Sequence, residues 1–91
     1  MSETFETITR WADESFGPAT VERQYERAAE EMIEFIDELP GPKKLMEAAD
    51  VVICLARLPG LQEAIDQKMA INRARKWAVR PDGTAYHIKT A

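Results

Sequence analysis

The sequence predicts an all-α protein whose helices, about four in number, pack into a bundle with short connections. Two observations indicate this class. Apolar residues recur at steps of three and four along most of the 91-residue chain. Proline and glycine divide the chain into segments of helical length. These breaks are Gly17-Pro18, Pro40-Gly41-Pro42, Pro59-Gly60 and Pro81-Asp82-Gly83.

The first two helices are predicted from their apolar stripes. The first segment ends near Phe16, and its stripe is Phe5, Ile8, Ala12 and Phe16. The second helix, about 20–39, begins at Thr20, whose hydroxyl suits an N-cap. Its stripe is Val21, Tyr25, Ala28, Met32, Phe35 and Leu39. Because the residue before a proline disfavours the α region, Leu39 marks the end of this helix.

Two further helices are expected over 42–58 and about 61–77. Pro42 suits the first turn of the third helix. The fourth helix carries the stripe Leu61, Ala64, Ile65 and Met69. We therefore expect one domain over residues 1–91, with a helical core of about 3–77. The tail, 78–91, is expected to be irregular or weakly extended.

Composition narrows the class of protein. Sixteen acidic against twelve basic residues give a net charge of −4, which argues against general nucleic-acid binding. The longest apolar run is far shorter than the ~20 residues that span a bilayer, so a cytoplasmic location without membrane attachment is expected. The single cysteine, Cys54, lies in an apolar run and is interpreted as a core residue. So short a chain buries only about 60–65% of its extended surface, which favours oligomerisation.

Two acidic pairs are the strongest functional signal. Glu31 and Glu34 stand three residues apart in the second helix, and Glu47 and Asp50 do so in the third. Each spacing puts both carboxylates on one helix face. Four such groups would repel one another and raise each other's pKa, whereas a divalent cation such as Mg²⁺ takes oxygen ligands. A solvated helix face is the alternative for Glu31 and Glu34.

The third helix gives the sharper argument. Apolar residues surround Glu47 and Asp50 on nearly every side, and a helix that is apolar all round is expected to be buried. A buried carboxylate needs a partner. A salt bridge to Lys43, Lys44 or Arg57 is one possibility; we prefer a metal ion.

Basic residues interrupt the inner stripe of the fourth helix. Lys68, Asn72 and Arg75 continue the line of its apolar residues, where they could bind phosphate oxygens. The alternative is that bases near a helix C-terminus only complement the helix dipole. Trp11 and Trp77 are candidates for stacking on a nucleobase, or else core residues. His87 lies in the tail and is interpreted as incidental.

The ordered set of motifs resembles one known superfamily. Glu30-Glu31-x-x-Glu34, twelve intervening residues and Glu47-x-x-Asp50 resemble the signature of the MazG-like all-α NTP pyrophosphatases. Lys68-Met69-x-x-Asn72-x-x-Arg75-x-Trp77 is similar to the segment that follows it. The resemblance covers about 20–77. Residues 11–18 and 82–87 are more loosely similar to a bacterial and phage subgroup, the dATP/dGTP pyrophosphohydrolases.

This resemblance implies a function and a set of roles. Members cleave an NTP or dNTP to the monophosphate and pyrophosphate, and work as dimers or tetramers. Mg²⁺, with Mn²⁺ as a substitute, would be bound by Glu31, Glu34, Glu47 and Asp50. Glu30 or Glu34 would orient or deprotonate the attacking water. Lys68, Asn72, Arg75, Trp11 and Trp77 would contact the substrate.

Two other classes compete with this hypothesis. A di-iron carboxylate bundle would need Glu-x-x-His pairs, and the one histidine, His87, lies outside the predicted helices. A non-catalytic oligomeric helical module that binds metal or nucleotide is the remaining alternative.

Overall fold

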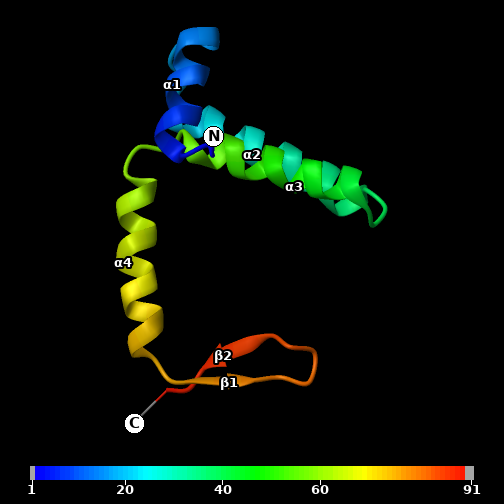
Figure 1. Ribbon diagram of the computed structural model, residues 1–91, viewed down its shortest axis with the longest axis vertical. Coiled ribbons are helices and arrows are strands. Elements are labelled where there is room, and N and C mark those ends of the chain that lie inside the picture. The colour runs from blue at the N-terminus through cyan, green and yellow to red at the C-terminus, as the bar shows by residue number, and fades with distance from the viewer. Residues whose placement is uncertain (1, 90–91) are drawn as a thin grey trace. The chain divides into compact units, whose positions relative to one another are not determined.

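The computed structural model describes residues 2–89 of the chain, as four helices followed by two short strands (Figure 1). The all-α class with four helices is confirmed. The chain divides into two compact units between Leu61 and Gln62, and the one-domain organisation stays a prediction. Within the described range, every helix is too short or too polar to cross a bilayer. Residues 90 and 91 of the predicted tail lie outside the described residues.

Helix α1, Phe5–Phe16, is closed by caps at both ends. Thr4 Oγ1 accepts from the Thr7 amide at 3.1 Å, and Thr7 Oγ1 accepts from the Thr4 amide at 2.8 Å. These reciprocal bonds satisfy amides that the first turn leaves free. At the other end Gly17, with φ of 80°, donates its amide to the Asp13 carbonyl at 2.9 Å. The helix ends at Phe16, as predicted.

Helices α2, Val21–Asp37, and α3, Pro42–Ala56, form an antiparallel pair joined by a short connection (Figure 1). The predicted N-cap is confirmed, since Thr20 Oγ1 accepts from the Arg23 amide at 3.1 Å. Pro42 occupies the first turn of α3. Lys44 Nζ donates to the carbonyls of Phe35 and Glu38, both at 2.9 Å. Both helices end two residues before their predicted ends, and the Lys44 bonds satisfy carbonyls at the end of α2.

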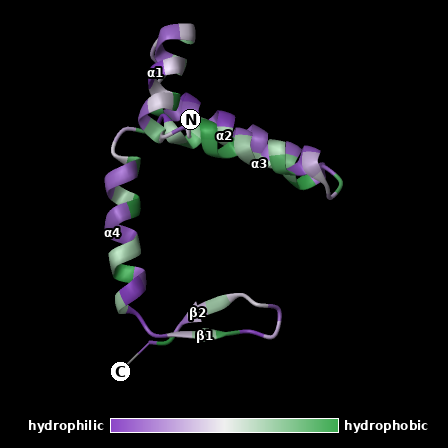
Figure 2. Ribbon diagram, in the orientation of Figure 1, coloured by the Kyte–Doolittle hydropathy of each residue, from purple (hydrophilic) through white to green (hydrophobic). Residues whose placement is uncertain are grey.

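The core of the first unit lies between these helices and α1, and it is small. Its buried apolar residues are Ala12, Ala28, Val51 and Ala56. The expectation that α3 is buried all round is wrong for the single chain, because Leu45 is 73% and Met46 68% exposed. Among residues 2–89, α2 and α1 are the helices that pack extensively against α3, and much of its remaining surface is exposed. Figure 2 shows apolar residues along the length of α3.

Helix α1 is fastened to the C-terminal end of α3 by hydrogen bonds. Thr9 Oγ1 donates to the Ala56 carbonyl at 3.0 Å. Arg57 Nη2 donates to Asp13 Oδ1 at 3.0 Å and to the Gly17 carbonyl at 2.8 Å. These contacts hold the last turn of α1 and the residue after it against α3.

The second unit corrects the predicted end of the helical core. Helix α4, Leu61–Ala74, ends three residues before 77, and β1, Trp77–Val79, pairs antiparallel with β2, Ala85–His87. The Arg80 amide bonds to the Thr84 carbonyl at 2.7 Å, and Asp82 Oδ1 accepts from the Thr84 amide at 3.0 Å. The Pro81-Asp82-Gly83 turn, with Gly83 at φ 90°, therefore folds a tail that was expected to be irregular or weakly extended into a hairpin.

Candidate functional site

Three carboxylates converge between α2 and α3. Glu31 and Glu34 lie one turn apart on α2, and Glu47 lies on α3. One carboxylate oxygen from each residue lies within 4.8 Å of the other two. Glu31 is 9% exposed, Glu47 is half-buried and Glu34 is exposed, so the cluster runs from the helix interface to the surface. The predicted convergence of acids from two helices is observed for these three, named here the carboxylate cluster.

The negative charges of this cluster are incompletely balanced. A hydrogen bond with Glu31, together with the charge of that residue, raises the pKa of Glu34 above its ordinary value. Partial desolvation and the charge of Glu47 act in the same direction. Acids so close together hold a proton more tightly than isolated ones. Carboxylate oxygens are also the ligands that Mg²⁺ and Mn²⁺ prefer, so this donor set fits a divalent cation.

Arginines pair with acids along the same helix. Arg27 donates from Nη2 to Glu31 Oε1 at 2.6 Å and from Nη1 to Glu30. Arg23 Nη1 donates to Glu30 at 3.4 Å and to Glu26 at 3.1 Å. The hydrogen bond from Arg27 lowers the pKa of Glu30. Glu30 is thus a partner of two arginines outside the carboxylate cluster, and its catalytic role stays a prediction.

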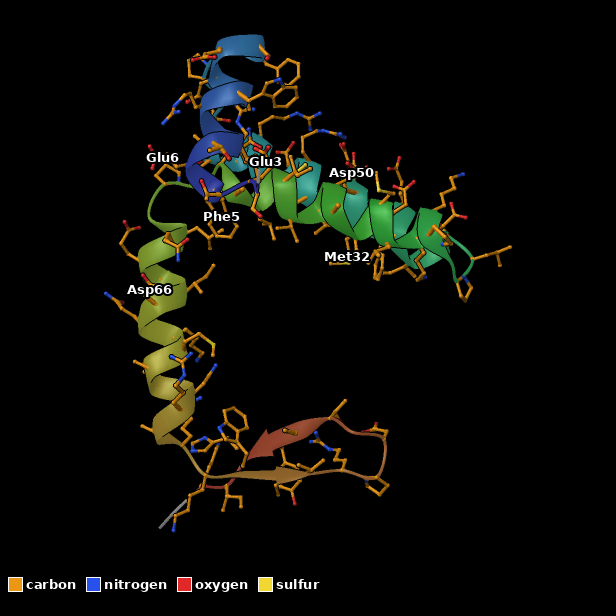
Figure 3. The ribbon with its side chains drawn as sticks, viewed as in Figure 1. Glu3, Phe5, Glu6, Met32, Asp50 and Asp66 are labelled. Carbon is orange, nitrogen blue, oxygen red and sulfur yellow. The ribbon has the colours of Figure 1, made fainter. Side chains whose placement is uncertain are left out.

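Asp50 lies one turn beyond Glu47 on α3 but is not brought into the carboxylate cluster. The expectation that it is buried is wrong for the single chain, because its side chain is exposed. In Figure 3, Asp50 and Met32 lie on opposite sides of the α2–α3 pair. Because it is exposed, Asp50 needs no partner charge in the single chain. Its role as a metal ligand stays a prediction that rests on the motif.

A pocket of about 300 Å³ lies beside the cluster, where α1 meets α2 and α3. Trp11 and Phe16 form an aromatic wall, with ring centroids 5.2 Å apart and planes at 85°. Trp11 is 56% exposed, so it is not a core residue. Ile53 and Cys54 add apolar surface from α3. Cys54 is half-buried and lines the pocket, so it lies outside the buried core, contrary to expectation, and partial desolvation raises the pKa of its thiol.

Polar side chains line the other walls of this pocket. Gln24 is 6% exposed. The amide orientation that satisfies both of its ends has the oxygen accepting from Arg57 Nη1 at 3.0 Å and the nitrogen donating to the Cys54 carbonyl at 3.3 Å. Arg27 lines the pocket while it contacts Glu31. Gln24 precedes Glu31 by seven residues, which is about 10 Å along a helix axis. The pocket and the carboxylate cluster are therefore neighbours on one pair of helices.

The remaining predicted substrate residues lie in the second unit. Lys68 is exposed and Arg75 half-buried on and just after α4. Asn72 Oδ1 is buried without a hydrogen-bond partner among residues 2–89. Trp77 Nε1 donates to the Asn72 carbonyl at 2.7 Å, and its ring lies 6.0 Å from that of His87. Their contacts with a substrate stay predictions.

Arg27 and Arg57 were not among the predicted site residues; Arg57 was considered only as a salt-bridge partner of Asp50, and it pairs with Asp13 instead. Arg27 precedes Glu30 and Glu31 by three and four residues, a spacing that predicts ion pairs on a helix and could have identified it. Arg57 contacts Asp13 and Gly17, which precede it in the chain by 44 and 40 residues. Local sequence holds no signal for such a contact.

Comparison with known proteins agrees with this geometry. A solved structure from cyanophage S-2L, a MazG-like pyrophosphohydrolase bound to dGDP and three catalytic Mn²⁺ ions per active site, is 28% identical to this chain. The likeness covers 100% of this chain and 99% of that one, with a TM-score of 0.65. No family model matches the sequence, and no curated protein matches it significantly.

Proposed function

The chain has the MazG-like helical fold that its acidic motifs predict, and from this premise we propose that it is a divalent-metal-dependent nucleotide pyrophosphohydrolase. It would convert a nucleoside triphosphate, such as dATP or dGTP, into the monophosphate and pyrophosphate. The observation that carries the proposal is the carboxylate cluster: three oxygens within 4.8 Å, in a fold shared over its whole length with a Mn²⁺-binding pyrophosphohydrolase.

Glu31, Glu34 and Glu47 would hold the metal, Mg²⁺ with Mn²⁺ as a substitute. Such an ion supplies a Lewis acid that neutralises phosphate charge and activates water. The similar phage enzyme binds three Mn²⁺ ions per active site, which favours further acidic ligands beside these three. That leaves a role for Asp50, exposed one turn from Glu47, as a fourth ligand.

Two acids, Glu34 and Glu30, are candidates for taking a proton from the attacking water. Glu34 is the exposed member of the carboxylate cluster, so water can reach its carboxylate beside the metal that the cluster would hold. We assign it the orientation or deprotonation of the attacking water. Glu30, held by Arg23 and Arg27, is the second candidate for this role.

The pocket beside the cluster would bind the nucleobase. Trp11 offers an exposed ring for stacking, and Phe16 supports it from the side. The separation of about 10 Å along α2 between the pocket and Glu31 is one that the sugar and phosphates of a nucleotide can span. Lys68, Asn72 and Arg75 would bind the departing pyrophosphate, and Trp77 would add a second aromatic contact.

A homo-oligomer, dimer or tetramer, is the proposed working form. Large apolar side chains stay open on α2 and α3, among them Ile33 at 60%, Ile36 at 64% and Leu45 at 73% exposure. Surface of this kind is typical of a subunit interface. Cytoplasmic location and the lack of nucleic-acid binding stay predictions.

A panel of all NTPs and dNTPs, each incubated with purified protein and Mg²⁺, tests the proposed reaction. We expect monophosphate and pyrophosphate in equal amounts from at least one nucleotide. Release of inorganic phosphate, or no turnover of any nucleotide with either Mg²⁺ or Mn²⁺, would refute it.

A further inference from the structure

We propose that Arg27 competes with the divalent cation for Glu31, and that it binds a phosphate oxygen of the nucleotide once the cation has displaced it. This inference rests on the proposed function, because it assumes a metal at the carboxylate cluster. It assigns to one arginine two successive partners, a carboxylate and a phosphate.

The first partner is visible in the hydrogen bonds. Arg27 Nη2 lies 2.6 Å from Glu31 Oε1, and Glu31 is the most buried acid of the cluster, with its side chain 11% exposed. The Arg27 side chain itself is 41% exposed. A partly exposed guanidinium thus neutralises the one cluster carboxylate that water reaches least. Without a cation this pairing stabilises the charge that α2 would otherwise bury alone.

The same contact opposes metal binding. A guanidinium so close to Glu31 places a full positive charge beside the position that a divalent cation would occupy. Two positive charges at such a distance repel strongly in a partly buried site. A cation therefore has to displace Arg27 from Glu31 or bind close to its positive charge. In both cases Arg27 lowers the affinity of the site for metal.

The second partner follows from the surroundings of Arg27. The residue lines the pocket as well as touching the cluster, so it lies between the proposed base and metal subsites. Its Nη1 keeps a contact with Glu30, an exposed acid outside the cluster. A released guanidinium can therefore stay near α2 and turn toward the phosphates. Its planar fork suits phosphate oxygens.

A static role predicts the opposite effect on metal affinity. Ligating carboxylates are commonly held by a hydrogen-bond donor, and loss of such a donor weakens metal binding about 10–100-fold. In the competing role that we propose, loss of the arginine strengthens metal binding. The sign of the change therefore separates the two roles.

Titration with Mn²⁺ alone, followed by the electron paramagnetic resonance signal of the free ion, tests this inference without relying on activity. We expect Arg27→Gln to bind Mn²⁺ about fivefold more tightly than the natural protein. Arg27→Lys keeps the charge and should bind Mn²⁺ within about twofold of it. Arg23→Gln is the matched control, because Arg23 contacts Glu26 and Glu30 but no cluster residue. It should leave Mn²⁺ affinity nearly unchanged.

A second titration uses a non-hydrolysable triphosphate analogue at saturating Mn²⁺. Here Arg27→Gln should bind the analogue about tenfold more weakly, because a charged hydrogen bond to phosphate is lost. Circular dichroism spectra verify that each variant folds.

Mn²⁺ binding by Arg27→Gln that is weaker than or equal to that of the natural protein, or unchanged analogue binding, would overturn the role of Arg27 and leave the proposed function intact. The metal site and the role of Arg27 would both be overturned if the natural protein binds no Mn²⁺, or if Glu47→Gln binds Mn²⁺ as tightly as the natural protein does.

Discussion

Replacing Arg57 by methionine should loosen the wall of the pocket and destabilise the fold. The guanidinium bonds to Asp13, to the Gly17 carbonyl and to Gln24, and only 12% of the side chain is exposed. Methionine keeps much of the apolar stem but donates no hydrogen bond. The last turn of α1, which carries Phe16, would lose its fastening to α3.

The size of this effect can be worked out bond by bond. A hydrogen bond from a charged group contributes roughly 1.5–3 kcal/mol when buried. The pair with Asp13 counts for about 0.5 kcal/mol or less, because Asp13 is 52% exposed and solvent screens it. The bonds to the Gly17 carbonyl and to buried Gln24 then dominate. Two such bonds, taken at the lower end of that range, give an expected loss of about 3 kcal/mol in the free energy of unfolding, or roughly 12–24 °C in Tm.

Thermal unfolding followed by far-UV circular dichroism, at one fixed protein concentration, measures this loss. Arg10→Met is the matched control, since Arg10 makes only an exposed ion pair with Glu6 on α1. It should cost no more than about 0.5 kcal/mol. If Arg57→Met and Arg10→Met unfold at the same temperature, Arg57 does not fasten α1 to α3 and the reasoning is wrong.

Three further predictions concern the metal, the base and the hairpin. Glu47→Gln should raise the Tm of the metal-free protein, because it relieves repulsion within the carboxylate cluster. It should also abolish the stabilisation by Mg²⁺ plus a non-hydrolysable nucleotide. A thermal-shift assay in which this ligand still raises the Tm of the variant would contradict this. Trp11→Ala should raise KM for the nucleotide about tenfold at similar kcat, because stacking is lost; an unchanged KM in steady-state kinetics would remove the base from this pocket. Hydrogen bonds from Thr84 lower the pKa of Asp82 below its ordinary value of 3.8. The hairpin therefore gains stability above that value and loses it as the pH falls through the lower folded pKa. The chemical shift of the Thr84 amide should report this loss, and Asp82→Ala should show no such transition.

The helices could be predicted from local pattern because their determinants are local. The cap at Thr20, the proline at 42 and the apolar stripes each act within a few residues. The β-hairpin could not be predicted in the same way. Its strands have only three residues each, too few for a clear alternation, and it depends on side-chain bonds within the turn at Asp82.

In the candidate site too, the features that depend on local sequence could be predicted, and those that depend on long-range contacts could not. Convergence of Glu31, Glu34 and Glu47 follows from helical spacing and a short connection, and it is observed. The expected burial of Asp50 is not observed in the single chain. An apolar helix predicts that its faces are covered, but the covering surface can belong to the same chain or to another one. Arg57 joins the site only through long-range contacts, which no local pattern encodes.

The central claim is that the carboxylate cluster catalyses cleavage between the α and β phosphates. Quantifying pyrophosphate and monophosphate from the best dNTP, with natural protein, Glu47→Gln and Glu14→Gln, tests it most directly. Glu14 is an exposed acid on α1, outside the carboxylate cluster, and its variant should match the natural protein. We predict equal amounts of the two products and a loss of at least about 100-fold in Glu47→Gln. Full activity in Glu47→Gln, or free phosphate as the product, would contradict the account.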